Sequence, residues 1–154
     1  MERLDRFAPP GMDTVSIRWW TIGVIAFSAV FSMSFLMEYA NELHELRRNM
    51  EQAVYHGMTM VPFRDLIVFP MLMFRIAPMV PLLHIPSNYM YFQQESKSLY
   101  LMKRLKNPWE MHLRCWALPV AAMLLVVAAG CAVYLLYQLY YYVCTPEILL
   151  PETL

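Results

Sequence analysis

Histidine spacing gives the first indication of what chemistry this sequence can perform. His44 and Glu45 match the first half of the zinc-binding pattern HExxH, but Arg48 stands where the second histidine is required. The histidines are also scattered along the chain: His44, His56, His84 and His112. Because zinc ligands usually recur at short, regular spacings, we expect no metal site.

The cysteines, glycines and serines do not indicate catalysis either. The three cysteines have spacings that fit no metal or redox motif, and we interpret them as apolar packing residues: Cys115, Cys131 and Cys144. None of the four glycines belongs to a phosphate-binding loop. Ser96 and Ser98 flank Lys97 in a basic segment that we expect to be exposed. We therefore expect no cofactor and no enzymatic activity.

Arg75 is the side chain that most suggests a ligand, because it stands within an apolar stretch. An arginine at the centre of a bilayer costs about 2.5–3.5 kcal/mol on insertion scales, and it usually faces protein or water. One interpretation is that Arg75 binds an anionic substrate or a lipid head group. The other is that it snorkels to the interface or pairs with Glu38 or Asp65. We favour the second, since long basic side chains snorkel readily.

The composition is that of a membrane protein. Of the 154 residues, 59% are hydrophobic and 16% are charged, whereas soluble domains are about 45–50% apolar and about 25% charged. The formal net charge is zero, so no overall field attracts nucleic acid. We expect a single helical membrane domain over residues 1–154, without room for a soluble catalytic domain.

Two apolar segments predict transmembrane helices. The first covers residues 17–38, and Trp19 and Trp20 at its start are typical of a membrane interface. Residues 38–48 have helical spacing and would extend this helix beyond the membrane. The last segment, residues 115–143, contains no charged side chain. It would extend about 43 Å as a helix, longer than a hydrocarbon core of about 30 Å, so it must tilt or project.

A third segment, residues 66–85, is apolar but contains Pro70, Pro78 and Pro81. Neighbouring helices can satisfy the carbonyl groups that proline frees in a membrane. We therefore predict a kinked second span, with a re-entrant or interfacial segment as the alternative. Residues 86–88 are predicted to form a turn. The expected fold is all-α, with about three transmembrane helices and a short cytoplasmic helix before the last span.

Charge asymmetry predicts the orientation. The segment 89–114 holds all five Lys and Arg residues between the predicted second and third spans: Lys97, Lys103, Arg104, Lys106 and Arg114. The segment between the first two spans and the C-terminal tail are acidic. Because loops rich in Lys and Arg stay in the cytoplasm, we expect segment 89–114 and the N-terminus to be cytoplasmic. A two-span hairpin with both termini outside is the alternative.

Segment 89–114 also offers a surface for a partner. We expect a helix from Glu95 to Leu105, in which leucine, methionine and tyrosine alternate with bases. Attraction to anionic lipid needs no apolar pattern, so docking of a cytoplasmic protein is favoured. The candidate docking residues are Glu95, Lys97, Tyr100, Lys103 and Arg104.

The sequence SKSLYLMKRLKNPWEMHLR, from Ser96 to Arg114, together with Ala117-Leu118-Pro119, resembles a segment of small membrane proteins of gut Firmicutes. These proteins look like part of an ABC-transporter permease of the type-2 exporter class. The resemblance implies a bacterial plasma membrane, other membrane subunits, and a separate cytoplasmic ATPase that docks on Glu95–Leu105. A permease half normally has six spans, so the chain would be a permease-like or accessory subunit. The alternative is a membrane interaction or regulatory protein without transport activity.

Overall fold

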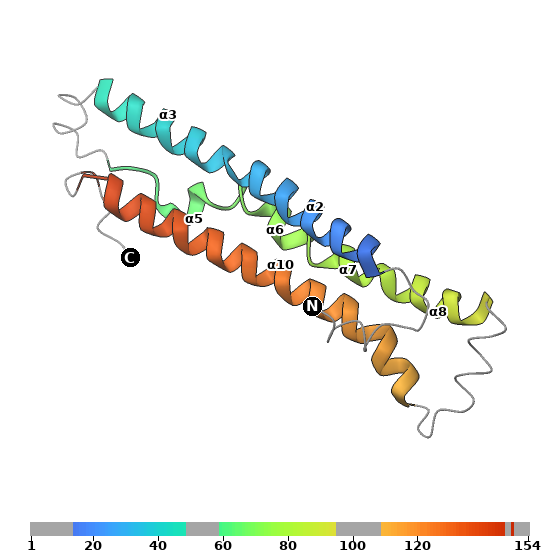
Figure 1. The fold of residues 1–154 in the computed structure, drawn as a ribbon. Helices are drawn as coiled ribbons and strands as arrows, with labels where there is room; N and C mark the ends of the chain where they lie inside the picture. Colours follow the sequence, from blue (N-terminus) through green and yellow to red (C-terminus); the bar gives the residue numbers. More distant parts are fainter. Residues whose placement is uncertain (1–13, 49–58, 95–108, 147–148, 150–154) are drawn as a thin grey trace. The chain divides into compact units, whose positions relative to one another are not determined.

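The structure is a computed structural model that describes residues 14–48, 59–94, 109–146 and 149 (Figure 1). Regular structure in these ranges is helical, as the sequence predicts. The longer helices are α2 (Thr14–Ser32), α3 (Ser34–Arg48), α8 (His84–Gln94) and α10 (Trp109–Cys144). The shorter ones are α5 (Phe63–Leu66), α6 (Leu72–Ile76) and α7 (Met79–Leu82).

Helices α2 and α3 are separated by a single residue, Met33. At this point backbone hydrogen bonds join residues three positions apart instead of the usual four. The Met33 amide bonds the Val30 carbonyl at 3.1 Å, and the Leu36 amide bonds the Met33 carbonyl at 3.0 Å. The Ser32 hydroxyl also donates to the Ala29 carbonyl at 2.8 Å. Serine side chains that bond the backbone in this way commonly bend helices. The predicted extension of the first span is thus present as α3.

Residues 66–85, the predicted kinked span, form short helices and turns. Backbone bonds bridge several of the breaks: Ile67 to the Phe63 carbonyl at 3.0 Å, Met71 to Ile67 at 3.1 Å and Arg75 to Met71 at 3.1 Å. Proline cannot donate such a bond, which accounts for interruptions in the helix. The segment therefore keeps much of its backbone bonded while changing direction.

The turn predicted at residues 86–88 is wrong, because all three belong to α8. Pro86 is the third residue of that helix. The first turn of a helix has backbone N–H groups without an intrahelical partner. A proline there sacrifices no hydrogen bond, so Pro86 is compatible with a helix start.

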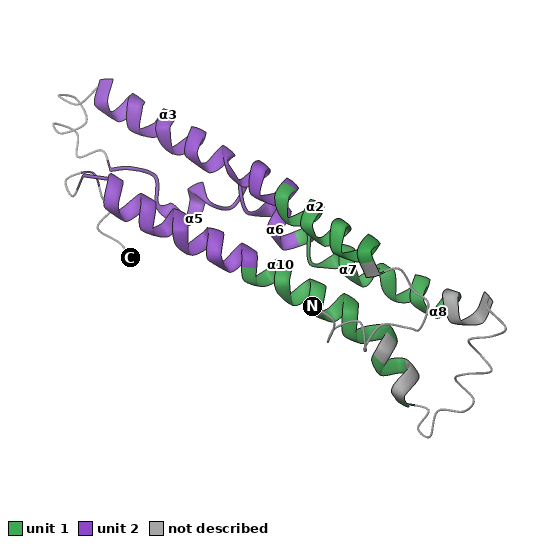
Figure 2. Cartoon of the chain, viewed as in Figure 1, with its two compact units in different colours: residues 1–26, 76–128 green, residues 27–75, 129–154 purple. Residues whose placement is uncertain are grey.

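The chain divides into two compact units (Figure 2). Unit 1 comprises residues 1–26 and 76–128, and unit 2 comprises residues 27–75 and 129–154. In unit 1 the wholly or almost wholly buried apolar side chains come from α2, the α6–α7 region and α10: Ile17, Ala77, Cys115, Ala122 and Val126. Asn88 of α8, a polar residue, is also 0% exposed.

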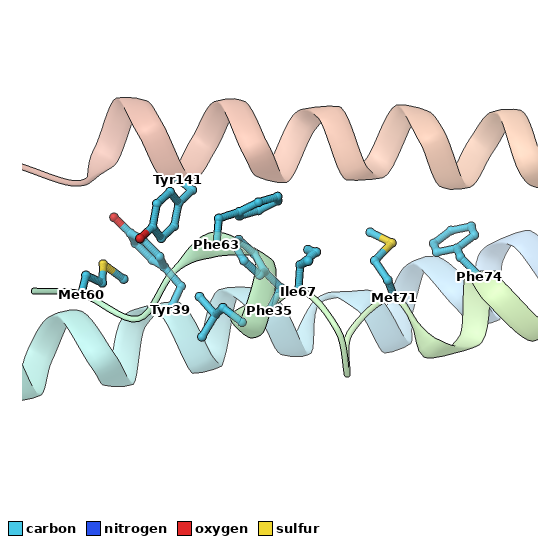
Figure 3. Close-up of a cluster of buried hydrophobic side chains, with 9 residues drawn as sticks. Phe35, Tyr39, Met60, Phe63, Ile67, Met71, Phe74 and Tyr141 are labelled. Atoms are coloured by element: carbon cyan, nitrogen blue, oxygen red, sulfur yellow. The ribbon is translucent and has the colours of Figure 1, made fainter. Parts of the chain in front are cut away.

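Unit 2 has an aromatic core in which α3, α5 and α10 meet (Figure 3). Phe35 stacks on Tyr137, with ring centroids 4.7 Å apart. Figure 3 shows Tyr141 projecting from α10 toward Tyr39, and their ring centroids are 6.0 Å apart. Phe63 of α5 contacts Tyr141 at 5.5 Å. Tyrosines near the end of α10 thus contribute to packing between the helices of unit 2.

Hydrogen bonds accompany this aromatic packing. The Tyr39 hydroxyl lies 3.2 Å from the Thr145 hydroxyl, and the Ser32 hydroxyl lies 3.2 Å from that of Tyr137. The Met60 amide bonds the Leu149 carbonyl at 2.8 Å. Hydroxyl and backbone groups are costly to bury without hydrogen-bond partners. These bonds therefore help to specify how the elements of unit 2 pack.

Two helical stretches are long and apolar enough to cross a membrane: Val15–Arg48, which includes the break at Met33, and Cys115–Cys144. Large apolar side chains on both are exposed, among them Phe27 at 64% and Leu136 at 63%. These stretches coincide with the first and last predicted spans. The third predicted span, residues 66–85, does not form a single long helix.

Candidate functional site

The predicted docking residues lie outside the described part of the chain: Glu95, Lys97, Tyr100, Lys103 and Arg104. The helix predicted from Glu95 to Leu105 lies outside it as well. The elements on either side are described, however. Helix α8 ends at Gln94 and α10 begins at Trp109, so the structure shows how the two ends of this segment are held.

Arg75 lies on α6 with an exposed side chain. Among the described residues, no ion pair joins it to Glu38 or Asp65, the partners considered from the sequence. The two residues that flank Arg75 on α6 differ in burial: Phe74 is 7% exposed, whereas Ile76 is 53% exposed. The arginine therefore points away from the packed side of its helix, an orientation that allows snorkelling.

The residues weighed for metal binding include His56, which lies outside the described residues; the described ones do not form a cluster. His44 and Glu45 lie on α3 with exposed side chains. Within the described ranges, no group of three or more His, Cys, Asp or Glu side chains is arranged to hold a metal ion. Cys115 is buried, whereas Cys131 and Cys144 are exposed free thiols, so only the first fits its predicted role as a packing residue.

Pro119 creates a specific need for a hydrogen-bond donor in unit 1. It lies inside α10, and its nitrogen carries no hydrogen, so the carbonyl of Cys115 four residues earlier lacks its usual helical partner. Cys115 is 0% exposed, which keeps water from this carbonyl. The side chain of Asn88 supplies the donor, with its Nδ2 3.0 Å from the Cys115 oxygen.

The next residue, Tyr89, makes a second polar contact with α10. Its hydroxyl lies 2.7 Å from Nδ1 of His112 and accepts a 3.2 Å hydrogen bond from the indole Nε1 of Trp116. Because the Tyr89 hydroxyl has one hydrogen, it can donate this hydrogen to His112 while accepting from Trp116.

We call the five residues of these contacts the α8–α10 clamp: Asn88, Tyr89, His112, Cys115 and Trp116. Cys115 and Trp116 lie three and four positions after His112, which places both on the His112 side of α10. The clamp has a buried half at Asn88 and an exposed half at Tyr89. The Oδ1 atom of Asn88 is buried without a hydrogen-bond partner, so the amide is only half satisfied.

A small hollow with a cavity volume of about 10 Å³ lies in unit 1, between α2 and the α7–α8 region. Apolar side chains line most of it, and the residues are Ile17, Trp20, Thr21, Val24, Val80, Pro81 and His84. Its polar groups are largely occupied or hidden: the Thr21 hydroxyl donates to the Ile17 carbonyl at 2.8 Å, and Nδ1 of His84 is buried. The lining offers no catalytic arrangement.

Sequence reasoning did not identify the clamp. Pro119 was the available signal, because a proline within a long apolar helix frees a carbonyl that another group must satisfy. The sequence shows this need but not the donor, since Asn88 lies 27 positions from Cys115. Because a turn was incorrectly predicted at residues 86–88, Asn88 and Tyr89 were not expected to lie on the same helix.

Comparisons with protein-family models, with curated proteins and with solved structures found no match for this chain. The described ranges define an all-helical protein with two stretches that could cross a membrane. Its most distinctive polar feature is the α8–α10 clamp.

Proposed function

We propose that this chain is a multi-span protein of a bacterial plasma membrane that serves as a permease-like or accessory subunit of an ABC transport system. The observation that carries the membrane part is the pair of long apolar stretches with exposed apolar side chains. The transport part rests on the basic segment 89–114 and its resemblance to type-2 exporter permeases. A separate cytoplasmic ATPase would supply the energy.

The depth of the helices in the bilayer follows from unit 2. Helix α3 carries Glu38, Glu42 and Glu45, and charges are costly in the hydrocarbon core. Tyr39 of α3 packs against Tyr141 near the end of α10. The end of α10 therefore lies at the level of these acids and projects beyond the hydrocarbon, which accounts for its excess length.

On the first apolar stretch, Val15–Arg48, the break at Met33 lies at the edge of the hydrocarbon core in this proposal. Helix α2 has 19 residues, which correspond to about 28 Å and match a hydrocarbon core of about 30 Å. The hydrogen-bonded pair Ser32 and Tyr137 lies at the same boundary. Polar groups at this level can contact the interface rather than lipid chains.

Residues 60–88 supply the third crossing in this proposal, as a broken segment alongside α10. In unit 2, Val61 bonds Tyr141, and Phe74 lies beside Gly130. In unit 1, Asn88 bonds Cys115. Within unit 2, the contacts of Val61 and Phe74 follow α10 in reverse order, as expected of a segment that returns antiparallel to it. Irregular backbone is tolerated at membrane depth where protein covers it.

With three crossings, the N-terminus and segment 89–114 lie on the same side of the membrane, and the Lys/Arg bias assigns that side to the cytoplasm, where an ATPase could reach the bases. Co-purification from the native membrane tests this assignment. We expect the wild-type chain to retain an ABC ATPase, and the variant Lys103→Glu/Arg104→Glu to lose it, because the reversed charges repel the acidic surface of the partner. An ATPase retained equally by both proteins would contradict the docking assignment.

Helix α3 offers a matched control. Arg47 and Arg48 are also adjacent, and both are exposed, but the proposed topology places them outside the cell. The variant Arg47→Glu/Arg48→Glu changes the net charge by the same amount as the Lys103 and Arg104 variant. It should retain the ATPase at the wild-type level. Loss of the ATPase in both variants would indicate a nonspecific charge effect and would also count against the proposal.

A further inference from the structure

Arg75 lies well inside the hydrocarbon core in the proposed depth. Phe74, the residue before it, projects from α6 toward α10 (Figure 3), where a Cβ atom on Gly130 would be 3.2 Å from Cδ1 of Phe74. Gly130 stands seven positions before Tyr137, which marks the extracellular edge of the core. Seven positions of helix correspond to about 10 Å, so Arg75 is placed about that far from the edge.

The side of α6 that carries Arg75 is exposed. Leu72, three positions earlier and therefore on the same face of α6, is exposed as well. So are two residues just before the helix, Val68 and Phe69. We call these four residues the α6 face: Val68, Phe69, Leu72 and Arg75. The α6 face thus presents one permanent positive charge among apolar side chains.

The described carboxylates of unit 2 do not neutralise this charge. They lie on α3 and α5, at Glu38, Glu42, Glu45 and Asp65, and none of them forms an ion pair with Arg75. Snorkelling serves basic side chains near the ends of a span, whereas Arg75 is about 10 Å from the edge. An arginine at membrane depth usually faces protein or water and marks a functional site.

A second copy of this chain cannot supply the missing carboxylate. In the proposed topology, the parts of the chain within the hydrocarbon core belong to residues 14–37, 66–94 and 115–146. These ranges contain no Asp or Glu. An anion at the depth of Arg75 must therefore come from a different molecule.

We propose that the α6 face binds a transmembrane helix of a different membrane subunit, through an ion pair between Arg75 and an Asp or Glu of that helix. This inference rests on the proposed function, which places α6 in the membrane and makes the chain one subunit of a larger assembly. A guanidinium group can bind a carboxylate through two parallel hydrogen bonds. Val68, Phe69 and Leu72 supply apolar contact for the rest of the partner helix.

Designed transmembrane peptides test this pairing directly. One peptide is a leucine-rich helix with a single glutamate at the depth of Arg75, and its control carries glutamine there. Energy transfer in neutral lipid vesicles reports association, from a donor dye on the exposed Cys144 of a Cys131→Ala chain to an acceptor on the peptide. We expect the glutamate peptide to bind roughly tenfold more tightly than the glutamine peptide. Equal affinities would overturn the proposal.

Substitutions in the chain show whether Arg75 is responsible. Arg75→Leu should abolish the preference for glutamate. Arg64→Leu is the matched control and should keep it, because Arg64 is also exposed but follows Phe63, which packs against Tyr141 beyond the proposed edge. In Arg75→Glu, a peptide with lysine should bind more tightly than the glutamate peptide. Loss of the preference in Arg64→Leu, or no reversal in Arg75→Glu, would contradict direct pairing.

A lipid phosphate is the competing anion for Arg75. The peptide measurements are therefore repeated in vesicles that contain phosphatidylglycerol, and we expect the same preference for glutamate. Loss of the preference there would show that a lipid head group pairs with Arg75, and it would overturn the proposal.

Insertion of the chain is measured in the same vesicles by reaction of Cys131 with a membrane-impermeant maleimide, in a Cys144→Ala chain. Protection of Cys131 is expected. Rapid labelling would contradict the membrane part of the proposed function, and the pairing with it. A protected Cys131 together with equal binding of the glutamate and glutamine peptides would overturn the pairing alone.

Discussion

The phenol of Tyr141 donates a 2.9 Å hydrogen bond to the carbonyl of Val61, 80 positions earlier in the chain. Tyr141 is 1% exposed and packs its ring against Phe63 and Tyr39. One side chain of α10 therefore contacts both α3 and the start of the broken segment. This bond fixes where residues 60–88 begin their course along α10.

Replacing Tyr141 by phenylalanine should destabilise unit 2 specifically. The ring packing is kept, but the Val61 carbonyl loses its donor, which costs about 1–3 kcal/mol when the acceptor stays away from water. Thermal unfolding in mild detergent, followed by circular dichroism, measures this loss. Tyr142→Phe is the control, because Tyr142 is 45% exposed, and it should unfold like the wild type. Equal stability of both variants would show that the bond is dispensable.

Gly130 should not tolerate a large side chain. A Cβ atom at this position would lie 3.2 Å from Cδ1 of Phe74, which is itself 7% exposed. Overpacking of this kind costs about 1–3 kcal/mol, so Gly130→Leu should lower the unfolding temperature. Gly23 of α2 has nothing within 4 Å of the corresponding atom, and Gly23→Leu should be neutral or stabilising, because leucine favours helix. Equal losses would mean that α6 does not pack closely against α10.

The number of crossings determines the side of the N-terminus. Three crossings place it in the cytoplasm together with the basic segment, whereas a two-span hairpin places it outside. A protease-cleavable tag added before Met1 should therefore be protected in intact cells and cut after the membrane is opened. Cleavage of the tag in intact cells would support the hairpin and contradict the crossing proposed for residues 60–88.

Long uncharged stretches made the two apolar helices predictable. The absence of charge from residues 115 to 143 indicates a helix in either lipid or a protein core, and α10 extends only a few residues beyond these bounds. The helical spacing of residues 38–48 likewise predicted α3. These features depend on local composition and periodicity, which sequence reasoning reads well.

The broken segment and the clamp depend on contacts distant in sequence. Pro86 suggested a turn because a proline is ambiguous between a break and the first turn of a helix. The burial of Tyr141 could not be read from its local sequence, because it depends on α3 and α5 packing against this side chain. Asn88 had no sequence signal of its own, because its role follows from the carbonyl that Pro119 frees.

The native cysteines offer the most direct test that α10 crosses a bilayer and projects at its C-terminal end. Cys131 and Cys144 are both exposed in the structure, so protein packing alone would let a reagent reach either thiol. In the proposed depth, lipid covers Cys131, whereas Cys144 reaches water. Cys115 is buried and serves as the unreactive reference.

Labelling of single-cysteine variants with a membrane-impermeant maleimide in intact cells measures this difference, because the thiolate that reacts requires water. We predict rapid labelling of Cys144, labelling of Cys131 only after detergent is added, and none of Cys115 before unfolding. Labelling of Cys131 as fast as Cys144 without detergent would contradict a membrane-spanning α10.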